Sequence, residues 1–285
     1  MVLKTKSILL ILLSLLFVGC ASYKYSVNIA DPAPINATAE NVIIFVAHQD
    51  DETFILTKII EHLKSGDNLH VIYTSLSYQN GESYKNKRIL ESKTALKSIG
   101  VDSDNVLFLG YPDGRTYKYL KEIIYKTDSL FYHIKPDIVY TSAFEGGHID
   151  HDIANFVISY LMTSHDYLSF EFPQYSGYKT WLTFKLRSFP KKPETHIRKL
   201  TKYEFQKVKE YWKYYESQHF PFGFYMSMTR GKKKSLGYLF LRKQPQYDYL
   251  ELPPTGNVAY KKYLKADFND FKNSIFEIIP AANSQ

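Results

Sequence analysis

The chain has little cysteine: Cys20 is the single cysteine among 285 residues, so no disulfide within the chain can stabilise the fold. It also lacks a Gly-x-Gly-x-x-Gly motif after its first predicted strand, which argues against dinucleotide binding. The formal charge of +7 is scattered, apart from the lysine run 232–234, and no basic stripe with interleaved aromatic residues is present. Nucleic-acid binding is therefore not expected.

The N-terminus has the pattern of an export signal. Lys4 and Lys6 precede the apolar run 8–18, which is shorter than the roughly 20 residues of a membrane-spanning helix. The run leads into Leu16-Phe17-Val18-Gly19-Cys20, which resembles a bacterial lipobox, where the cysteine becomes the lipid-modified first residue. We expect residues 1–19 to be a signal peptide and Cys20 to anchor an exported lipoprotein to the periplasmic or extracellular face of the cell envelope. The alternative is a buried cysteine at the end of an uncleaved anchor.

From residue 41, strand patterns alternate with helical ones. Strands are predicted at 42–46, 69–75, 106–109, 138–142 and 168–172, and helices at 53–64, 84–99, 117–133 and 153–164. Further on, the pattern predicts a strand at 180–186, a helix at 202–217 and a strand at 236–241. Repeated β-α units predict a Rossmann-like α/β fold, with a mostly parallel sheet covered by helices on both faces. We expect a tether at 20–40 and one α/β domain at 41–285, with a motif-bearing core at 41–173 and a C-terminal α+β extension at 174–285.

Two short motifs place imidazole and carboxylate groups at predicted strand ends. Ala47-His48-Gln49-Asp50-Asp51-Glu52 follows the strand 42–46, and Gly147-His148-Ile149-Asp150-His151 comes shortly after the strand 138–142. The carboxyl ends of parallel strands meet at one edge of a sheet, where α/β proteins build their sites. A separation of three residues, as in His48-x-x-Asp51 and His148-x-x-His151, puts both groups on one side of a helical turn. Either motif alone is more typical of a helix N-terminus or of chance, but the two together indicate a metal site.

Hydrolytic zinc sites use three nitrogen or oxygen ligands and keep one position open for water. His48, Asp51 and His151 are the expected ligands, with zinc as the expected metal and another divalent metal such as iron as the alternative. The sequence therefore predicts a metal-dependent hydrolase.

The other charged groups of the two motifs then have roles in the chemistry. Asp50 would take the proton of the metal-activated water. His148 would stabilise the developing oxyanion or protonate a leaving amine. Asp150 would accept a proton from a ring nitrogen and orient that imidazole.

The two motifs resemble those of the PIG-L/LmbE-like family, whose zinc-dependent members remove acetyl groups from N-acetylglucosaminyl conjugates. Further similarity lies in the segments 80–82, 88–101 and 108–114, so the resemblance covers about 41–154. The resemblance implies that His48, Asp51 and His151 hold the metal and that Asp50 is the general base. It implies that His148 is the electrophilic or acid partner, as the residues themselves also indicate. It also implies that Arg88 and Asp113 contact sugar hydroxyls, where the alternatives are a surface salt bridge and a turn-forming Asp-Gly.

The chain departs from the family pattern in three places. Gln49 and Ile149 stand where the family usually has proline, and Tyr215 stands for histidine in a segment, 215–218, that shapes the substrate pocket. We expect a lipid-anchored enzyme that removes the N-acetyl group from an N-acetylglucosamine-type sugar or glycoconjugate. The alternatives are a zinc amidase acting on a non-sugar amide, and a lipid-anchored glycan-binding protein with a vestigial metal site. The presence of Asp50 argues against the latter, because binding needs no base. The sequence does not specify the oligomeric state.

Overall fold

The computed structural model describes residues 39–77, 81–176, 185–186, 195–219, 236–260 and 264–279. The predicted signal peptide, Cys20 and nearly all of the tether lie outside these residues, as does most of the strand predicted at 180–186. Within the described ranges, no helix has both the length and the apolar character needed to cross a membrane.

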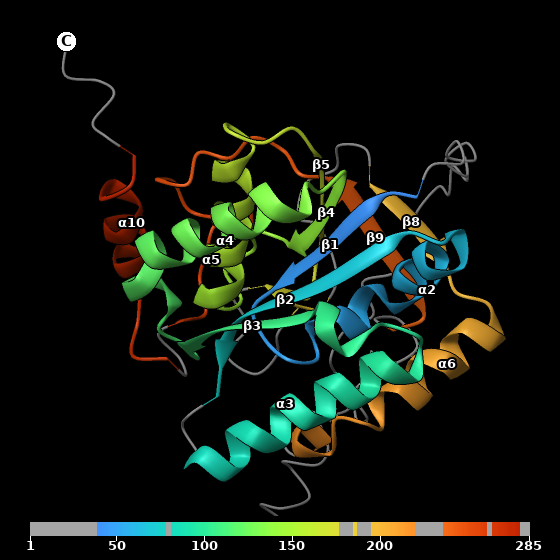
Figure 1. The fold of residues 1–285 in the computed structure, drawn as a ribbon. Helices are drawn as coiled ribbons and strands as arrows, with labels where there is room; N and C mark the ends of the chain where they lie inside the picture. Colours follow the sequence, from blue (N-terminus) through green and yellow to red (C-terminus); the bar gives the residue numbers. More distant parts are fainter. Residues whose placement is uncertain are drawn as a thin grey trace, which may run out of the picture. The chain divides into compact units, whose positions relative to one another are not determined.

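A seven-stranded sheet forms the centre of the fold, in the order β3-β2-β1-β4-β5-β9-β8 (Figure 1). Its strands are β1 (Asn41–Val46), β2 (Asn68–Leu76), β3 (Val106–Pro112), β4 (Ile138–Ser142), β5 (Leu168–Phe172), β8 (His196–Lys199) and β9 (Tyr238–Lys243). The first five strands are parallel to one another, whereas β9 runs antiparallel to both β5 and β8. A separate small ladder pairs β6 (Tyr175–Ser176) with β7 (Lys185–Leu186). This arrangement confirms the predicted α/β fold with a mostly parallel sheet.

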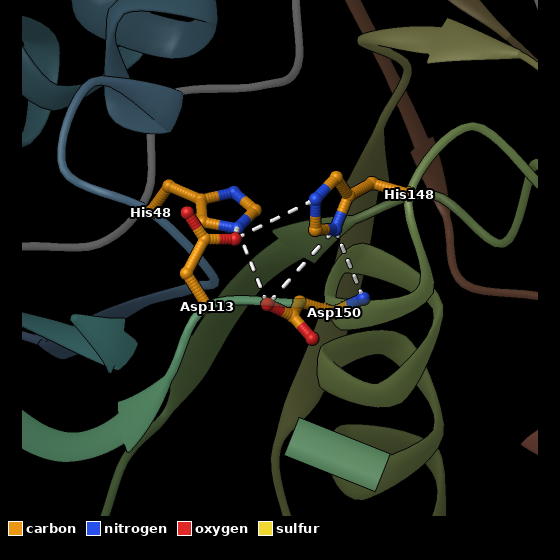
Figure 2. Close-up of side chains that lie close together, drawn as sticks. All are labelled: His48, Asp113, His148 and Asp150. Carbon is orange, nitrogen blue, oxygen red and sulfur yellow. Dashed lines mark hydrogen bonds and ion pairs between the residues drawn. The ribbon is translucent and has the colours of Figure 1, made fainter. Parts of the chain in front are cut away.

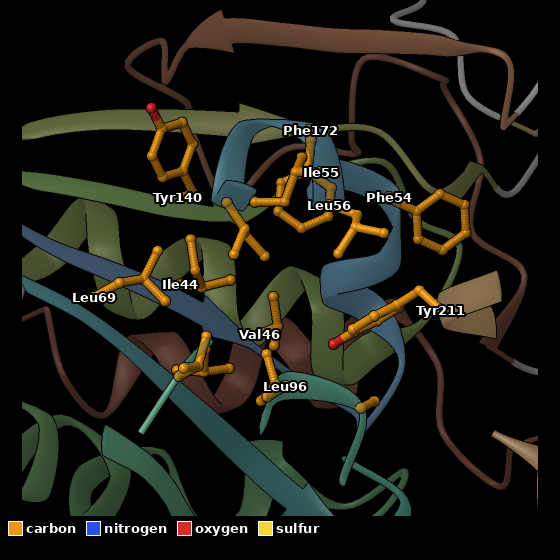
Figure 3. Close-up of a cluster of buried hydrophobic side chains, with 14 of the residues drawn as sticks. Ile44, Val46, Phe54, Ile55, Leu56, Leu69, Leu96, Tyr140, Phe172 and Tyr211 are labelled. Atoms are coloured by element: carbon orange, nitrogen blue, oxygen red, sulfur yellow. The ribbon is translucent and has the colours of Figure 1, made fainter. Parts of the chain in front are cut away.

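The central strand β1 is apolar along nearly its whole length because both of its faces are covered. Val42, Ile44 and Val46 point into one hydrophobic cluster, and Ile43 and Phe45 point into another. The first cluster, drawn in Figure 3, joins the sheet to helices α2 (Leu56–Ser65), α3 (Gly81–Ser98) and α6 (Lys202–Trp212). The second joins it to α4 (Leu120–Ile134), α5 (Ile149–Leu161) and α10 (Phe268–Phe276).

Several helices begin or end differently from the prediction. Short 3₁₀ turns, η1 (Asp51–Ile55) and η3 (Thr116–Tyr119), precede α2 and α4, and η2 (Ser103–Asn105) precedes β3. Helix α5 begins four residues before the predicted start, because the His148 side chain caps it by accepting the N–H of Asp150. The helix predicted at 202–217 ends at Trp212 and is followed by a turn and by η4 (Glu216–Gln218). The strand β8 and the helix α10 were not predicted.

A buried ion pair fastens the antiparallel strand β9 to β5. The Glu171 carboxylate is fully buried and accepts from Arg242 Nε at 2.6 Å, Tyr247 Oη at 2.7 Å and Asn155 Nδ2 at 2.8 Å. Burial raises the pKa of Glu171, and the Arg242 guanidinium and the other donors oppose that rise. Loss of the arginine would therefore leave a buried carboxylate without its compensating charge.

We predict that Arg242→Leu lowers the free energy of unfolding at neutral pH by about 3–5 kcal/mol, because it leaves the buried Glu171 charge without its ionic partner. The double variant Arg242→Leu/Glu171→Leu should recover most of this loss. Arg198→Leu is the control, since Arg198 is 31% exposed and its pairs with Glu61 and Glu204 should contribute less than about 1 kcal/mol. Urea unfolding measures all three. An Arg242→Leu variant as stable as the Arg198 control would contradict the prediction.

Candidate active site

The candidate site lies where the loops after β1, β3 and β4 come together at the carboxyl edge of the parallel strands. The sheet order places β1 directly beside β4, so the two sequence motifs meet although they are about a hundred residues apart. His48 and Asp51 come from the loop and 3₁₀ turn after β1, and His148 and His151 from the start of α5. Asp113 follows the end of β3 and completes the group.

One nitrogen from each of two imidazoles and the two carboxylate oxygens of Asp51 converge at the centre of the site. His48 Nδ1 lies 3.1 Å from His151 Nε2 and 3.6 Å from Asp51 Oδ2, and His151 Nε2 lies 3.3 Å from Asp51 Oδ1. Ligand atoms bound tetrahedrally at zinc distances are about 3.3 Å apart, so the set fits such an ion. Burial alone would raise the pKa of Asp51, but the two imidazoles hold it well below its usual range. An ionised carboxylate between two imidazole nitrogens is a donor set suited to zinc or iron.

The other nitrogen of His48 faces two carboxylates. Its Nε2 lies 3.2 Å from Asp113 Oδ1 and 3.3 Å from Asp150 Oδ2 (Figure 2). Asp150 is itself fixed, because it accepts from the Gly114 N–H at 2.6 Å and from Thr116 Oγ1 at 2.6 Å. With a metal on Nδ1, Nε2 would carry the proton and the two carboxylates would orient the ring.

The four residues of Figure 2, His48, Asp113, His148 and Asp150, also bring donor atoms within 4.8 Å of one another. Both oxygens of Asp150, however, already accept hydrogen bonds from Gly114 or Thr116. The set His48, Asp51 and His151 is therefore the better candidate for a metal site, and Asp150 contacts the outer ring nitrogen of His48.

His148 is held as a neutral imidazole. Its Nδ1 accepts the Asp150 N–H at 3.2 Å, which leaves the proton on Nε2, 3.6 Å from Asp113 Oδ1. Burial, followed by the nearby His48 ring, lowers the pKa of His148 to about 4. At neutral pH the group can donate a hydrogen bond to an oxyanion, but it does not carry the extra proton that a general acid would need.

Asp50 has an unusual backbone and a buried cationic neighbour. Its φ is 132°, a region that residues other than glycine rarely adopt, and such strain is typical of functional positions. Arg88 Nη1 lies 3.5 Å from Asp50 Oδ2, and Arg88 Nη2 donates to the Gln49 carbonyl. Burial raises the pKa of Asp50 to about 7 despite the opposing effect of Arg88. Arg88 is only 4% exposed, so it is not the surface salt bridge considered as an alternative.

These groups open onto a pocket of about 300 Å³. Its lining includes the predicted residues His48, Asp50, Asp51, Arg88, Asp113 and His148. The walls include Gln49, Phe54, Ser77, Tyr84, Tyr175 and Gln218. Tyr175 packs its ring against His151, with centroids 5.2 Å apart, and no sequence motif pointed to it. Gln218 belongs to the segment 215–218 that the family pattern had singled out, but Tyr215 is fully buried and its hydroxyl contacts Glu52.

The loop before His148 is held in place by further buried carboxylates. Asp152 Oδ1 accepts the N–H of Glu145 at 3.1 Å, and Glu145 Oε1 accepts the N–H of Gln174 at 2.6 Å. Gly147 allows the backbone of Tyr175 to pass close to this loop, because a Cβ at position 147 would lie 1.7 Å from the Tyr175 carbonyl oxygen. Burial raises the pKa of Glu145 to about 8.

The part of the chain that contains the two motifs matches a known protein family. Residues 43–161 match the sequence model of the PIG-L family, described as GlcNAc-PI de-N-acetylase. This match confirms the resemblance to PIG-L/LmbE-like proteins that the two motifs carry. A search of curated proteins gave no significant match.

Solved structures with a similar fold include two deacetylases. One is the deacetylase of teicoplanin biosynthesis in its "bog" complex, with 12% identity, a TM-score of 0.54, and coverage of 71% of this chain and 98% of that one. The other is the A40926 pseudoaglycone deacetylase Dbv21, with 10% identity, a TM-score of 0.54, and coverage of 72% and 98%. A zinc inhibited form of teicoplanin deacetylase Orf2 gives 11% identity, a TM-score of 0.53, and coverage of 71% and 98%. The chain shares their fold.

We predict that Glu145→Gln changes how stability depends on pH. The native carboxyl has a pKa of about 8 against an ordinary value of 4.5, so its stabilising contribution is complete below pH 4.5 and is lost as the pH rises through 8. Glutamine stays neutral and can still accept the Gln174 N–H. The variant should therefore gain stability over the wild type between pH 5 and pH 8, by up to about 4 kcal/mol. Urea unfolding at pH 5 and pH 8 measures the free energy of unfolding of both proteins. An equal difference between variant and wild type at the two pH values would contradict the prediction.

Proposed function

We propose that the protein is a metal-dependent N-deacetylase that acts on an N-acetylglucosamine-type sugar or glycoconjugate. The observation that carries the proposal is the convergence of His48, Asp51 and His151 beside Asp50, with ligand atoms within 4.8 Å of one another. This group lies in a segment that matches a family described as GlcNAc-PI de-N-acetylase. The solved structures with a similar fold include a deacetylase of teicoplanin biosynthesis and the A40926 pseudoaglycone deacetylase Dbv21, which supports a deacetylation reaction.

The residues present suit zinc, with iron as the alternative, and His48, Asp51 and His151 would hold it. The chemistry that the metal supplies when bound is a lowered pKa of water and a polarised acetyl carbonyl.

The protein's own groups would carry the proton and the developing charge. Asp50 lies on the pocket wall and takes the proton of the attacking water, while Arg88 holds its carboxylate. The Nε2–H of His148 donates to the oxyanion that develops on the acetyl oxygen. The C–N bond then breaks, the proton held by Asp50 passes to the leaving amine, and the products are acetate and the free amino sugar.

The site of action is proposed from the sequence. A lipid anchor at Cys20 would place the enzyme outside the cytoplasmic membrane. Substrates in that location are glycans of the cell envelope or of the environment.

We predict that the zinc-loaded protein releases acetate from at least one member of a panel of N-acetylhexosamine compounds, and that chelation abolishes release. Asp50→Asn should retain bound metal and lower kcat about 10²–10⁴-fold, because it removes the base but no ligand. His151→Ala should lose the metal itself. Metal content by atomic emission and acetate release by a coupled assay separate the two variants. Stoichiometric zinc without release from any sugar would instead favour an amidase for non-sugar substrates or a binding protein.

Residues on the outer pocket wall should distinguish a sugar from a simple amide. Arg88 and Asp113 are unsuited to this test, because they contact Asp50 and His48. Gln218 lines the pocket, and its side chain donates to Tyr84 and Ser217, not to Asp50 or His48. We predict that Gln218→Ala raises KM about tenfold for a sugar substrate, since one hydrogen bond is lost. Gln206→Ala, on the exposed face of α6, is the matched control, and equal KM values for both variants would argue against a sugar contact at Gln218.

A further inference from the structure

The backbone of Asp50 is held by a carboxylate outside the pocket. The Asp50 N–H donates to Glu52 Oε2 at 3.1 Å, and the Glu52 side chain is fully buried. The pocket lining includes Gln49, Asp50 and Asp51 but not Glu52. Glu52 can therefore influence the reaction only through the residues that it holds or through its charge, which acts on nearby Asp50.

The second oxygen of Glu52 is held by the C-terminal part of the chain. Glu52 Oε1 accepts from the hydroxyl of Tyr211 at 2.8 Å and from the hydroxyl of Tyr215. Both tyrosines are buried, and burial together with the nearby Glu52 carboxylate raises their pKa values well above the ordinary one. They therefore remain hydrogen-bond donors at any physiological pH.

The same segment is fastened at two further points. Ser217 donates through its N–H at 2.9 Å and its hydroxyl at 2.5 Å to Glu91 on α3, and Gln218 Nε2 donates to the Tyr84 hydroxyl at 2.9 Å. Tyr211 and Tyr215 thus reach Glu52 from a backbone that is itself fixed against α3. An acceptor held in this way can keep Asp50 at a φ of 132°, a conformation that persists only where its surroundings over-determine it.

We propose that Glu52, held by Tyr211 and Tyr215, is a positioning residue that keeps the Asp50 carboxylate directed into the pocket. The inference rests on the proposed function, in which Asp50 takes the proton of water. Without the acceptor at Glu52, Asp50 relaxes to a negative φ and its carboxylate leaves the position beside Arg88. If the two tyrosines only filled the core, loss of their hydroxyls would lower stability and leave turnover unchanged.

The first test compares phenol variants in the zinc-loaded full chain. Tyr211→Phe/Tyr215→Phe should lower kcat for acetate release at least about tenfold, with KM and zinc content unchanged. Tyr167→Phe is the control, because Tyr167 is buried, donates to the Ile158 carbonyl at 2.6 Å and precedes the opposite end of β5. A double variant that keeps the kcat of Tyr167→Phe overturns the proposal.

The second test replaces the acceptor itself. Glu52→Gln keeps an oxygen for the Asp50 N–H and should retain kcat within about threefold, whereas Glu52→Leu should lose about thirtyfold or more. Rescue by glutamine identifies a positioning role. A glutamine variant as impaired as the leucine variant would assign the effect to the charge of Glu52 and overturn the proposal.

A third readout does not depend on activity. Hydrogen exchange of the Asp50 amide, followed in the metal-free full chain, should be at least about tenfold faster in Tyr211→Phe/Tyr215→Phe than in the wild type or in Tyr167→Phe. Accelerated exchange in a protein that deacetylates no substrate would support the proposal that Glu52 positions Asp50 and would contradict the proposed deacetylase function. Unchanged exchange together with unchanged kcat in an active protein would support the proposed function and contradict the positioning role of Glu52.

Discussion

The imidazole of His48 joins the two halves of the site. Its Nδ1 faces Asp51 and His151, and its Nε2 faces Asp113 and Asp150, so one ring contacts groups that follow β1, β3 and β4. A metal on one nitrogen fixes the proton on the other, and the carboxylates that accept this proton fix the plane of the ring. The geometry of the donor set therefore depends on three separate loops, which only the strand order β3-β2-β1-β4 brings together.

Phenol hydroxyls satisfy part of the buried acid in this protein, and at Glu171 they do so together with the Arg242 guanidinium. Three fully buried carboxylates accept from phenol hydroxyls: Glu52 from Tyr211 and Tyr215, Asp152 from Tyr260, and Glu171 from Tyr247. A buried carboxyl without a partner would be costly, and a phenol supplies a strong donor together with apolar surface. Part of the high tyrosine content, 25 residues, is explained by this use.

The core of the fold and the meeting of the two motifs could be predicted because their signals are local. The run Val42–Val46 predicts a buried parallel strand, and the motifs that follow β1 and β4 lie at strand ends. The contacts of Tyr215 could not be predicted, because its hydroxyl meets Glu52 across 163 positions, and nothing in the apolar pattern encodes that pair. For the same reason the helix predicted at 202–217 was too long: the chain turns after Trp212 to bring Tyr215 to Glu52.

The dependence of Asp50 on Tyr211 and Tyr215 has a consequence for how the chain can be divided. The family match ends at Leu161, and a chain shortened there would still contain all three candidate ligands and Asp50. It would lack Tyr175 and Gln218 from the pocket wall and both phenols that hold Glu52. In the proposed mechanism, the candidate metal ligands and the residues that hold Asp50 in position thus lie in different stretches of sequence. The proposal therefore implies that a change in the C-terminal part can impair turnover while the candidate ligand motifs stay intact.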